Sequence, residues 1–176
     1  MNQKESTYFS IIHKHQMTGI GLRVYSNKKI FYTIIEETDT NYDFLTVDHI
    51  NVPLAMNEPE RLNYIRNTII DIIAEYDINN ALVRVKESLF NVSKRDIERF
   101  YIEGVLLESL AGSTVSKYKL GQIATITSLI GIERKNFKKF ADNELAFENI
   151  PDNIDWSTIS KEERESIMAC HASLKL

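Results

Sequence analysis

Glu103 is the acidic residue whose setting most suggests chemistry. It lies three positions after Phe100 and four before Leu107, so on a helix its carboxylate shares a stripe with apolar side chains. A carboxylate on such a stripe costs free energy unless it has a partner or is protonated. One interpretation is that Glu103 is a metal ligand or a general acid. The simpler one is that its side chain reaches the edge of the sheet and pairs with Lys86 or Arg84.

A cationic segment between residues 133 and 140 could bind nucleic acid. Its four cations are Arg134, Lys135, Lys138 and Lys139. Cations interleaved with Phe137 and Phe140 suit phosphates and stacked bases. A solvated amphipathic helix with both phenylalanines packed inward explains the same residues. Lys94, Arg95 and Arg99 form a second cationic cluster, open to the same two interpretations.

Other catalytic patterns are missing from the sequence. It has no Gly-x-Ser-x-Gly turn of a serine hydrolase and no glycine-rich loop for a nucleotide. His13 and His15 could share a metal on one face of a strand, but no third ligand is nearby, and a solvated lead-in is the simpler interpretation. His171, at helical spacing from Ile167, is interpreted as a core histidine whose ring is hydrogen-bonded.

The totals describe an ordinary globular protein. The chain has 176 residues, 43% hydrophobic and 26% charged, with a net charge of −4, so only a local basic face could hold nucleic acid. Its single cysteine, Cys170, lies in an apolar run and predicts a buried thiol in a reducing compartment. Without a signal peptide or a run of about 20 apolar residues, we expect a cytoplasmic protein that does not enter a membrane. Residues 1–16 are predicted to be a polar lead-in to one domain at 17–176.

The elements that must position these side chains can be read from the hydrophobic pattern. Residues 19–38 are typical of a hairpin, and a third strand is expected at 44–52. Two short strands are expected later, at 81–85 and at 115–120. Helices are predicted after Asn57, Ser93, Gln122 and Ser160, and three of these starts have an acidic residue three positions on, as in a capping box: Glu60, Asp96 and Glu163. Three antiparallel strands followed by alternating helices and strands predict an α/β fold with a mixed sheet covered on both faces.

Four short segments give this order a family resemblance. Thr18-Gly19-Ile20-Gly21 resembles the Gly-Ile-Asp opening of RuvC-type Holliday-junction resolvases. Residues 122–131, with Lys135 after them, resemble the segment that follows the fifth strand of those proteins, and residues 162–170 resemble their closing helix. Residues 100–104 resemble a segment of a RuvC-related bacterial family of unknown function. The resemblance implies a ribonuclease H-like fold with a mixed five-stranded sheet.

The chemistry that the resemblance implies is phosphodiester hydrolysis by two Mg²⁺ ions about 4 Å apart, held by three or four carboxylates. This sequence departs from that ligand set. The first-strand carboxylate falls at Gly21, and the fourth-strand glutamate falls at Lys86, although Glu87 is adjacent. The final-helix pair is retained as Glu162 and Glu165. Both can also be explained without metal, as acidic residues in the first turn that favour the positive end of the helix dipole.

These departures predict a catalytically degenerate RuvC-like protein that acts as a nucleic-acid- or protein-binding module, with no cofactor. The alternative is a divergent nuclease dependent on Mg²⁺ or Mn²⁺, with a rearranged site built from Glu87, Glu103, Glu162 and Glu165. A third alternative is a homo-oligomeric structural subunit, such as a homodimer.

Overall fold

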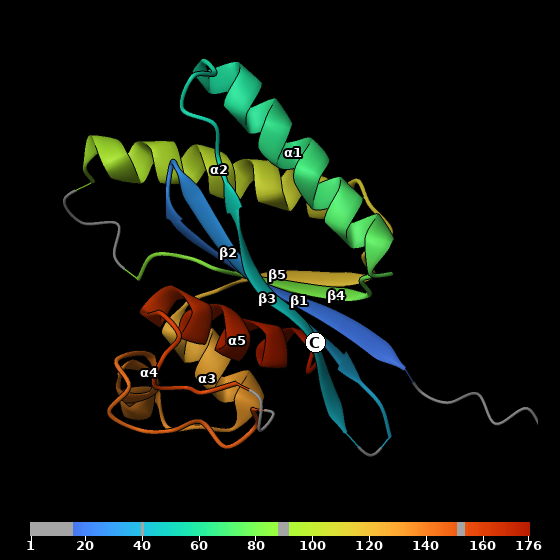
Figure 1. Ribbon diagram of the computed structural model, residues 1–176, viewed down its shortest axis with the longest axis vertical. Helices are drawn as coiled ribbons and strands as arrows, with labels where there is room; N and C mark the ends of the chain where they lie inside the picture. Colours follow the sequence, from blue (N-terminus) through green and yellow to red (C-terminus); the bar gives the residue numbers. More distant parts are fainter. Residues whose placement is uncertain (1–15, 40, 88–91, 151–153) are drawn as a thin grey trace, which may run out of the picture.

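A mixed five-stranded sheet runs through the middle of the molecule (Figure 1). The structure is a computed structural model and describes residues 16–39, 41–87, 92–150 and 154–176; His13 and His15 lie outside them. The strands are β1 (Met17–Ser26), β2 (Lys29–Glu37), β3 (Tyr42–Asn51), β4 (Asn80–Arg84) and β5 (Lys117–Gly121). Their order is β3-β2-β1-β4-β5, with β1–β2 and β2–β3 antiparallel and with β4 parallel to both β1 and β5.

Helices cover both faces of this sheet, as Figure 1 shows. The helices are α1 (Glu58–Glu75), α2 (Lys94–Ala111), α3 (Ile123–Ile130), α4 (Arg134–Ala141) and α5 (Lys161–Ser173). Helices α1 and α2 pack on one face, and α5 lies across the other with α3 and α4 beside it. The predicted α/β class, the mixed five-stranded sheet and the two helical layers are therefore confirmed. None of the helices in the described ranges is long and apolar enough to span a membrane.

Three helix starts are fixed by the local sequence, as predicted. In each one a side chain accepts from the backbone amide three residues on, and the acidic residue there accepts from the cap amide in return. The pairs are Asn57 with Glu60, Ser93 with Asp96, and Ser160 with Glu163. These caps set where α1, α2 and α5 begin, and thus which of their side chains face the sheet.

The alternation of β1 decides what each face of the sheet can hold. Ile20, Leu22 and Val24 are fully buried in the core beneath α1 and α2. The intervening residues face α5, and two of them, Gly19 and Gly21, have no side chain. Glycine at these positions lets the backbone of α5 lie directly against the strand.

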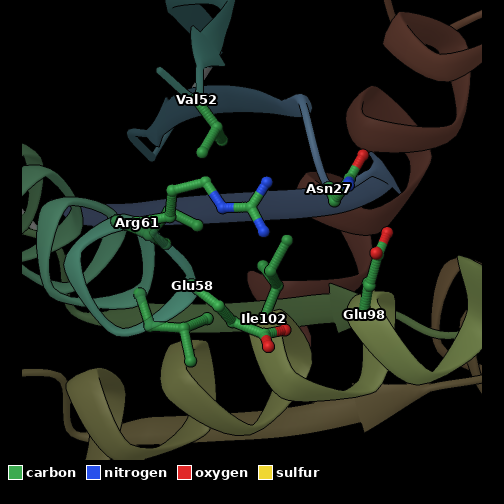
Figure 2. A pocket seen from close by; sticks show the side chains of 8 residues that line it. Asn27, Val52, Glu58, Arg61, Glu98 and Ile102 are labelled. Atoms are coloured by element: carbon green, nitrogen blue, oxygen red, sulfur yellow. The ribbon is translucent and has the colours of Figure 1, made fainter. Parts of the chain in front are cut away.

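A pocket lies on the opposite face, between α1, α2 and the turn that joins β1 to β2 (Figure 2). Apolar side chains such as Val52 and Ile102 line it together with the charged Glu58, Arg61 and Glu98. Its volume is about 10 Å³, which is roughly the space of one water molecule. The pocket is too small for a ligand.

Candidate functional site

Gly21 lies where the family resemblance places the first metal-binding carboxylate, and α5 closes over it. A β-carbon built at Gly21 would lie 2.2 Å from the backbone nitrogen of Cys170 and 2.2 Å from the carbonyl oxygen of Ser166. Real β-carbons do not approach backbone atoms this closely. The backbone of α5 therefore occupies the space that an aspartate side chain would need.

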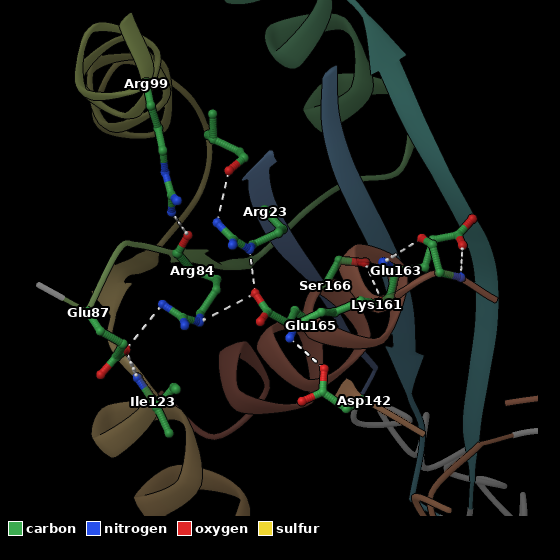
Figure 3. Close-up of polar contacts among 12 residues, drawn as sticks. Arg23, Arg84, Glu87, Arg99, Ile123, Asp142, Lys161, Glu163, Glu165 and Ser166 are labelled. Carbon is green, nitrogen blue, oxygen red and sulfur yellow. Dashed lines mark hydrogen bonds and ion pairs between the residues drawn. The ribbon is translucent and has the colours of Figure 1, made fainter. Parts of the chain in front are cut away.

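Two arginines lie two residues beyond Gly21 and its partner on β4. Arg23 of β1 and Arg84 of β4 are register partners, and the carboxylate of Glu165 on α5 contacts both (Figure 3). Nε of Arg23 donates to Oε2 of Glu165, and Nε of Arg84 lies 3.7 Å from the same oxygen. The side chains of Arg84 and Glu165 are only 5% and 6% exposed, so these are buried ion pairs. Burial lowers the pKa of Arg84.

Glu87 lies on the other side of Arg84. Its Oε1 atom is 3.2 Å from Nη1 of Arg84 and accepts a hydrogen bond of 2.7 Å from the backbone nitrogen of Ile123, the first residue of α3. Figure 3 shows the Glu87 carboxylate between the two. Arg134, at the start of α4, lies 3.8 Å from Oε2 of Glu87. The carboxylate is thus held by a helix start and by two guanidinium groups.

Glu103 has a partner, but not the one predicted from the sequence. Oε1 of Glu103 accepts from Nε of Arg99, one turn earlier on α2, at 2.6 Å. Lys86 instead pairs with Asp96 at 2.8 Å, and the contact of Arg84 with this region is a 3.4 Å hydrogen bond from Arg99 to its carbonyl oxygen. The prediction of a pair with Lys86 or Arg84 is therefore wrong. Arg99 is buried, so it does not belong to a surface cationic cluster.

The closing-helix glutamates occupy two different environments. Helix α5 begins at Lys161, which puts Glu162 in its first turn as predicted. Glu165 lies beyond the first turn, and it is 5% exposed and paired with the sheet. Favourable interaction with the helix dipole is therefore not the main role of Glu165, and for that residue the first-turn interpretation is wrong.

The residues at this end of the sheet do not fit a pair of divalent ions. Gly21 offers no ligand, and Arg23 and Arg84 bring positive charge to the place where the resemblance puts metal. Within the ranges that the structure describes, no three histidine, cysteine, aspartate or glutamate side chains form a group that could hold a metal ion. Glu87, Glu103, Glu162 and Glu165 thus do not converge into a ligand set.

A cationic cleft of about 580 Å³ opens beside the ion pairs, between α3 and α4. Its lining residues are Glu87, Ile123, Arg134, Lys135 and Lys138. Lys139, the fourth predicted cation, is exposed on α4 but does not line the cleft. Phe137 is fully buried under the guanidinium of Arg84, 5.5 Å from its ring centre, and Phe140 is partly buried. The inward packing of both aromatic residues is confirmed, so Phe137 has no free face for stacking on a base.

His171 and Cys170 belong to the core, as predicted. The His171 ring is hydrogen-bonded to the carbonyl oxygen of Asn149 at 2.8 Å, and burial lowers its pKa to about 4. Cys170 is fully buried, which raises the pKa of its thiol to about 12. Neither side chain has the exposure that a nucleophile or a general base needs.

Known structures share the fold of this chain over about 90% of its length. Thermus thermophilus RuvC aligns with a TM-score of 0.64 at 8% identity, covering 90% of this chain and 94% of that one. The same protein in complex with a Holliday junction substrate aligns with a TM-score of 0.62 at 8% identity, covering 90% and 93%. The chain has the RuvC-type ribonuclease H-like fold. The yeast mitochondrial Holliday junction resolvase Ydc2 is similar too, with a TM-score of 0.54 and 10% identity over 89% of this chain and 77% of that one.

Comparison of structures detects this similarity, whereas comparison of sequences does not. No family model matches the sequence, and no curated protein matches it. Sequence reasoning also missed Arg23 and Arg84 as site residues. The signal was present in Ala81-Leu82-Val83-Arg84-Val85, where one arginine interrupts an apolar run that is completely buried up to Arg84.

Proposed function

We propose that this chain is a RuvC-like module that binds nucleic acid and does not cleave it. Two features at the position where the resemblance places metal support the proposal. The backbone of α5 fills the space above Gly21, and the carboxylate of Glu165 is engaged by Arg23 and Arg84. Releasing Glu165 for a metal would leave Arg23 without its anion and the buried guanidinium of Arg84 with Glu87 alone, which costs several kcal/mol.

Support for binding comes from the position of the cationic cleft. Arg134, Lys135 and Lys138 line it directly beside the ion pairs, so phosphates would meet positive charge next to the former metal position. The similar Thermus RuvC was solved with a Holliday junction substrate, and branched DNA is therefore the first ligand to test. Because the net charge is −4, binding would depend on this local patch and would weaken steeply with salt.

One set of samples tests both parts of the proposal. A labelled synthetic four-way DNA junction is mixed with the protein at low salt, with Mg²⁺ or Mn²⁺, and is analysed on native and denaturing gels. We expect a shifted complex that disappears with rising salt, and no cleavage product. Replacing Arg134 and Lys138 by Gln should weaken the complex about tenfold or more, since each phosphate contact contributes separately.

A matched control removes the same charge from the opposite face. Arg61→Gln with Arg66→Gln on α1 should change the affinity far less, because α1 and α4 lie on opposite sides of the sheet. Metal-dependent cleavage that Glu165→Gln abolishes would contradict the proposal and establish the nuclease alternative. If neither the junction nor a single-stranded RNA binds at low salt, nucleic acid is not the ligand and a protein partner replaces it.

A further inference from the structure

The Glu87 carboxylate lies in surroundings that suit a phosphate. It accepts from the first backbone amide of α3 at 2.7 Å, although Glu87 precedes that residue by 36 positions. The N-cap residue of α3, Gln122, makes no capping hydrogen bond with its own side chain in the described structure. The helix start therefore takes its anion from outside the helix. Backbone amides and the positive end of the dipole make such starts natural anion sites.

Arg84 independently indicates that an anion belongs here. Its side chain is 5% exposed and points at Glu87, with Nη1 at 3.2 Å from Oε1. Nevertheless Nε and Nη1 are both buried without a hydrogen-bond partner among the described residues. The neighbouring carboxylates lie within ion-pair distance but do not accept these hydrogens in good geometry. A buried guanidinium with unused donors favours a second acceptor, and phosphate oxygens match its planar geometry.

The charges around the cleft are also unbalanced. Arg84 and Arg134 lie within 4 Å of the carboxylate of Glu87, and Lys138 lines the same cleft, while Lys135 is paired with Glu133 at 2.6 Å. Lys138 has no ion-pair partner in the part of the chain that the structure describes. Glu87 is 30% exposed and lies beyond the end of β4, so its side chain can rotate away without disturbing the sheet.

We infer that Glu87 occupies a phosphate site formed by the first turn of α3, Arg84 and Arg134, and that a backbone phosphate displaces its carboxylate when nucleic acid binds. The inference rests on the proposed function and adds that the Glu87 carboxylate competes with nucleic-acid phosphate for this site. The carboxylate keeps the cationic groups paired in the free protein, so each binding event must first displace it. A bound phosphate takes over the amide of Ile123 and both guanidinium contacts.

Removing the charge of Glu87 tests whether its carboxylate competes with phosphate. In Glu87→Gln the amide oxygen can still accept from Ile123, so the helix start keeps its cap. We expect the variant to bind the labelled four-way junction about threefold to tenfold more tightly than the wild type, measured by fluorescence anisotropy at fixed salt. Glu133→Gln is the matched control, because Glu133 is the N-cap residue of α4 and carries one charge in the same region, but its side chain makes no capping hydrogen bond and pairs with Lys135. It should strengthen binding by less than about twofold.

A second measurement needs no variant. On saturation of the wild type with the junction, the backbone amide resonance of Ile123 should shift, because its acceptor changes from carboxylate to phosphate. The amide of Glu60, capped by Asn57 at the start of α1, should stay unchanged. Equal gains in Glu87→Gln and Glu133→Gln, or an Ile123 amide that does not move, would overturn the inference while leaving the proposed function intact. If the wild type binds neither the junction nor single-stranded RNA at low salt, the proposed function itself is contradicted.

Discussion

Arg23 and Arg84 are paired across β1 and β4, and one carboxylate, that of Glu165, contacts both guanidinium groups. Two like charges on neighbouring strands repel each other unless an anion lies between them. Glu165 supplies that anion from α5, and so joins the helix to the sheet at the point where the resemblance to RuvC would place metal. The same residue therefore has a structural role in this fold.

Removing the charge of Glu165 should destabilise the fold strongly. Glu165→Gln leaves Arg23 without its counter-ion and the buried Arg84 with Glu87 as its one remaining anion among the described residues, so we expect the free energy of unfolding to fall by about 3 kcal/mol. Urea denaturation followed by circular dichroism measures this loss. Glu108→Gln is the control, because Glu108 is 59% exposed and pairs with Arg66 at 3.0 Å, and it should cost less than about 1 kcal/mol. Similar small losses in both variants would show that the buried pairs do not hold α5 in place.

An aspartate at Gly21 should destabilise the fold. The new side chain would meet the backbone of Cys170 and Ser166, so α5 must move, and we expect a loss of roughly 3 kcal/mol or more in the free energy of unfolding. Gly104→Ala serves as the control, because its β-carbon meets nothing within 4 Å on an exposed face of α2. That substitution should stabilise the protein by about 0.5–1 kcal/mol. A Gly21→Asp variant as stable as the wild type would contradict the close approach of α5.

Protonation of His171 should weaken the fold in mild acid. Burial lowers its pKa from 6.5 to about 4, so between these values the unfolded chain binds a proton that the folded protein does not. Stability therefore falls as the pH drops below 6.5, by about 3 kcal/mol from this residue between pH 7 and pH 4. Urea denaturation at several pH values, compared with His171→Gln, isolates the effect, because other acid-sensitive groups are common to both proteins. Parallel stability curves for the two proteins would show that the ring is not buried in its neutral form.

Local patterns predicted most of the fold and little of the site. Capping residues such as Asn57 and Ser160 act on amides three positions away, so the sequence alone locates their helix starts. The apolar alternation in β1 likewise reveals a strand. The ion pair of Glu165 with Arg23 joins residues 142 positions apart, and the hydrogen bond from the Ile123 amide to Glu87 joins residues 36 positions apart. Such contacts depend on strand register and on how far α5 can approach Gly21, and no short pattern encodes either.

The error over Glu103 has the same origin. On a helical wheel its apolar stripe indicated a partner across the sheet, whereas Arg99 satisfies it from the preceding turn of α2. The sequence places Arg99 close to Lys94 and Arg95 and so predicts one cationic cluster. Its burial against the sheet is a tertiary effect that neighbouring charges in the sequence do not reveal.

The most direct test of the central claim is anomalous diffraction from crystals soaked in manganese. We predict no anomalous peak among Gly21, Glu165 and Glu87, with the carboxylate of Glu165 still in contact with Arg23 and Arg84. A manganese ion bound there by Glu165 and Glu87, with the arginines turned away, would contradict the claim that ion pairs have replaced the metal site.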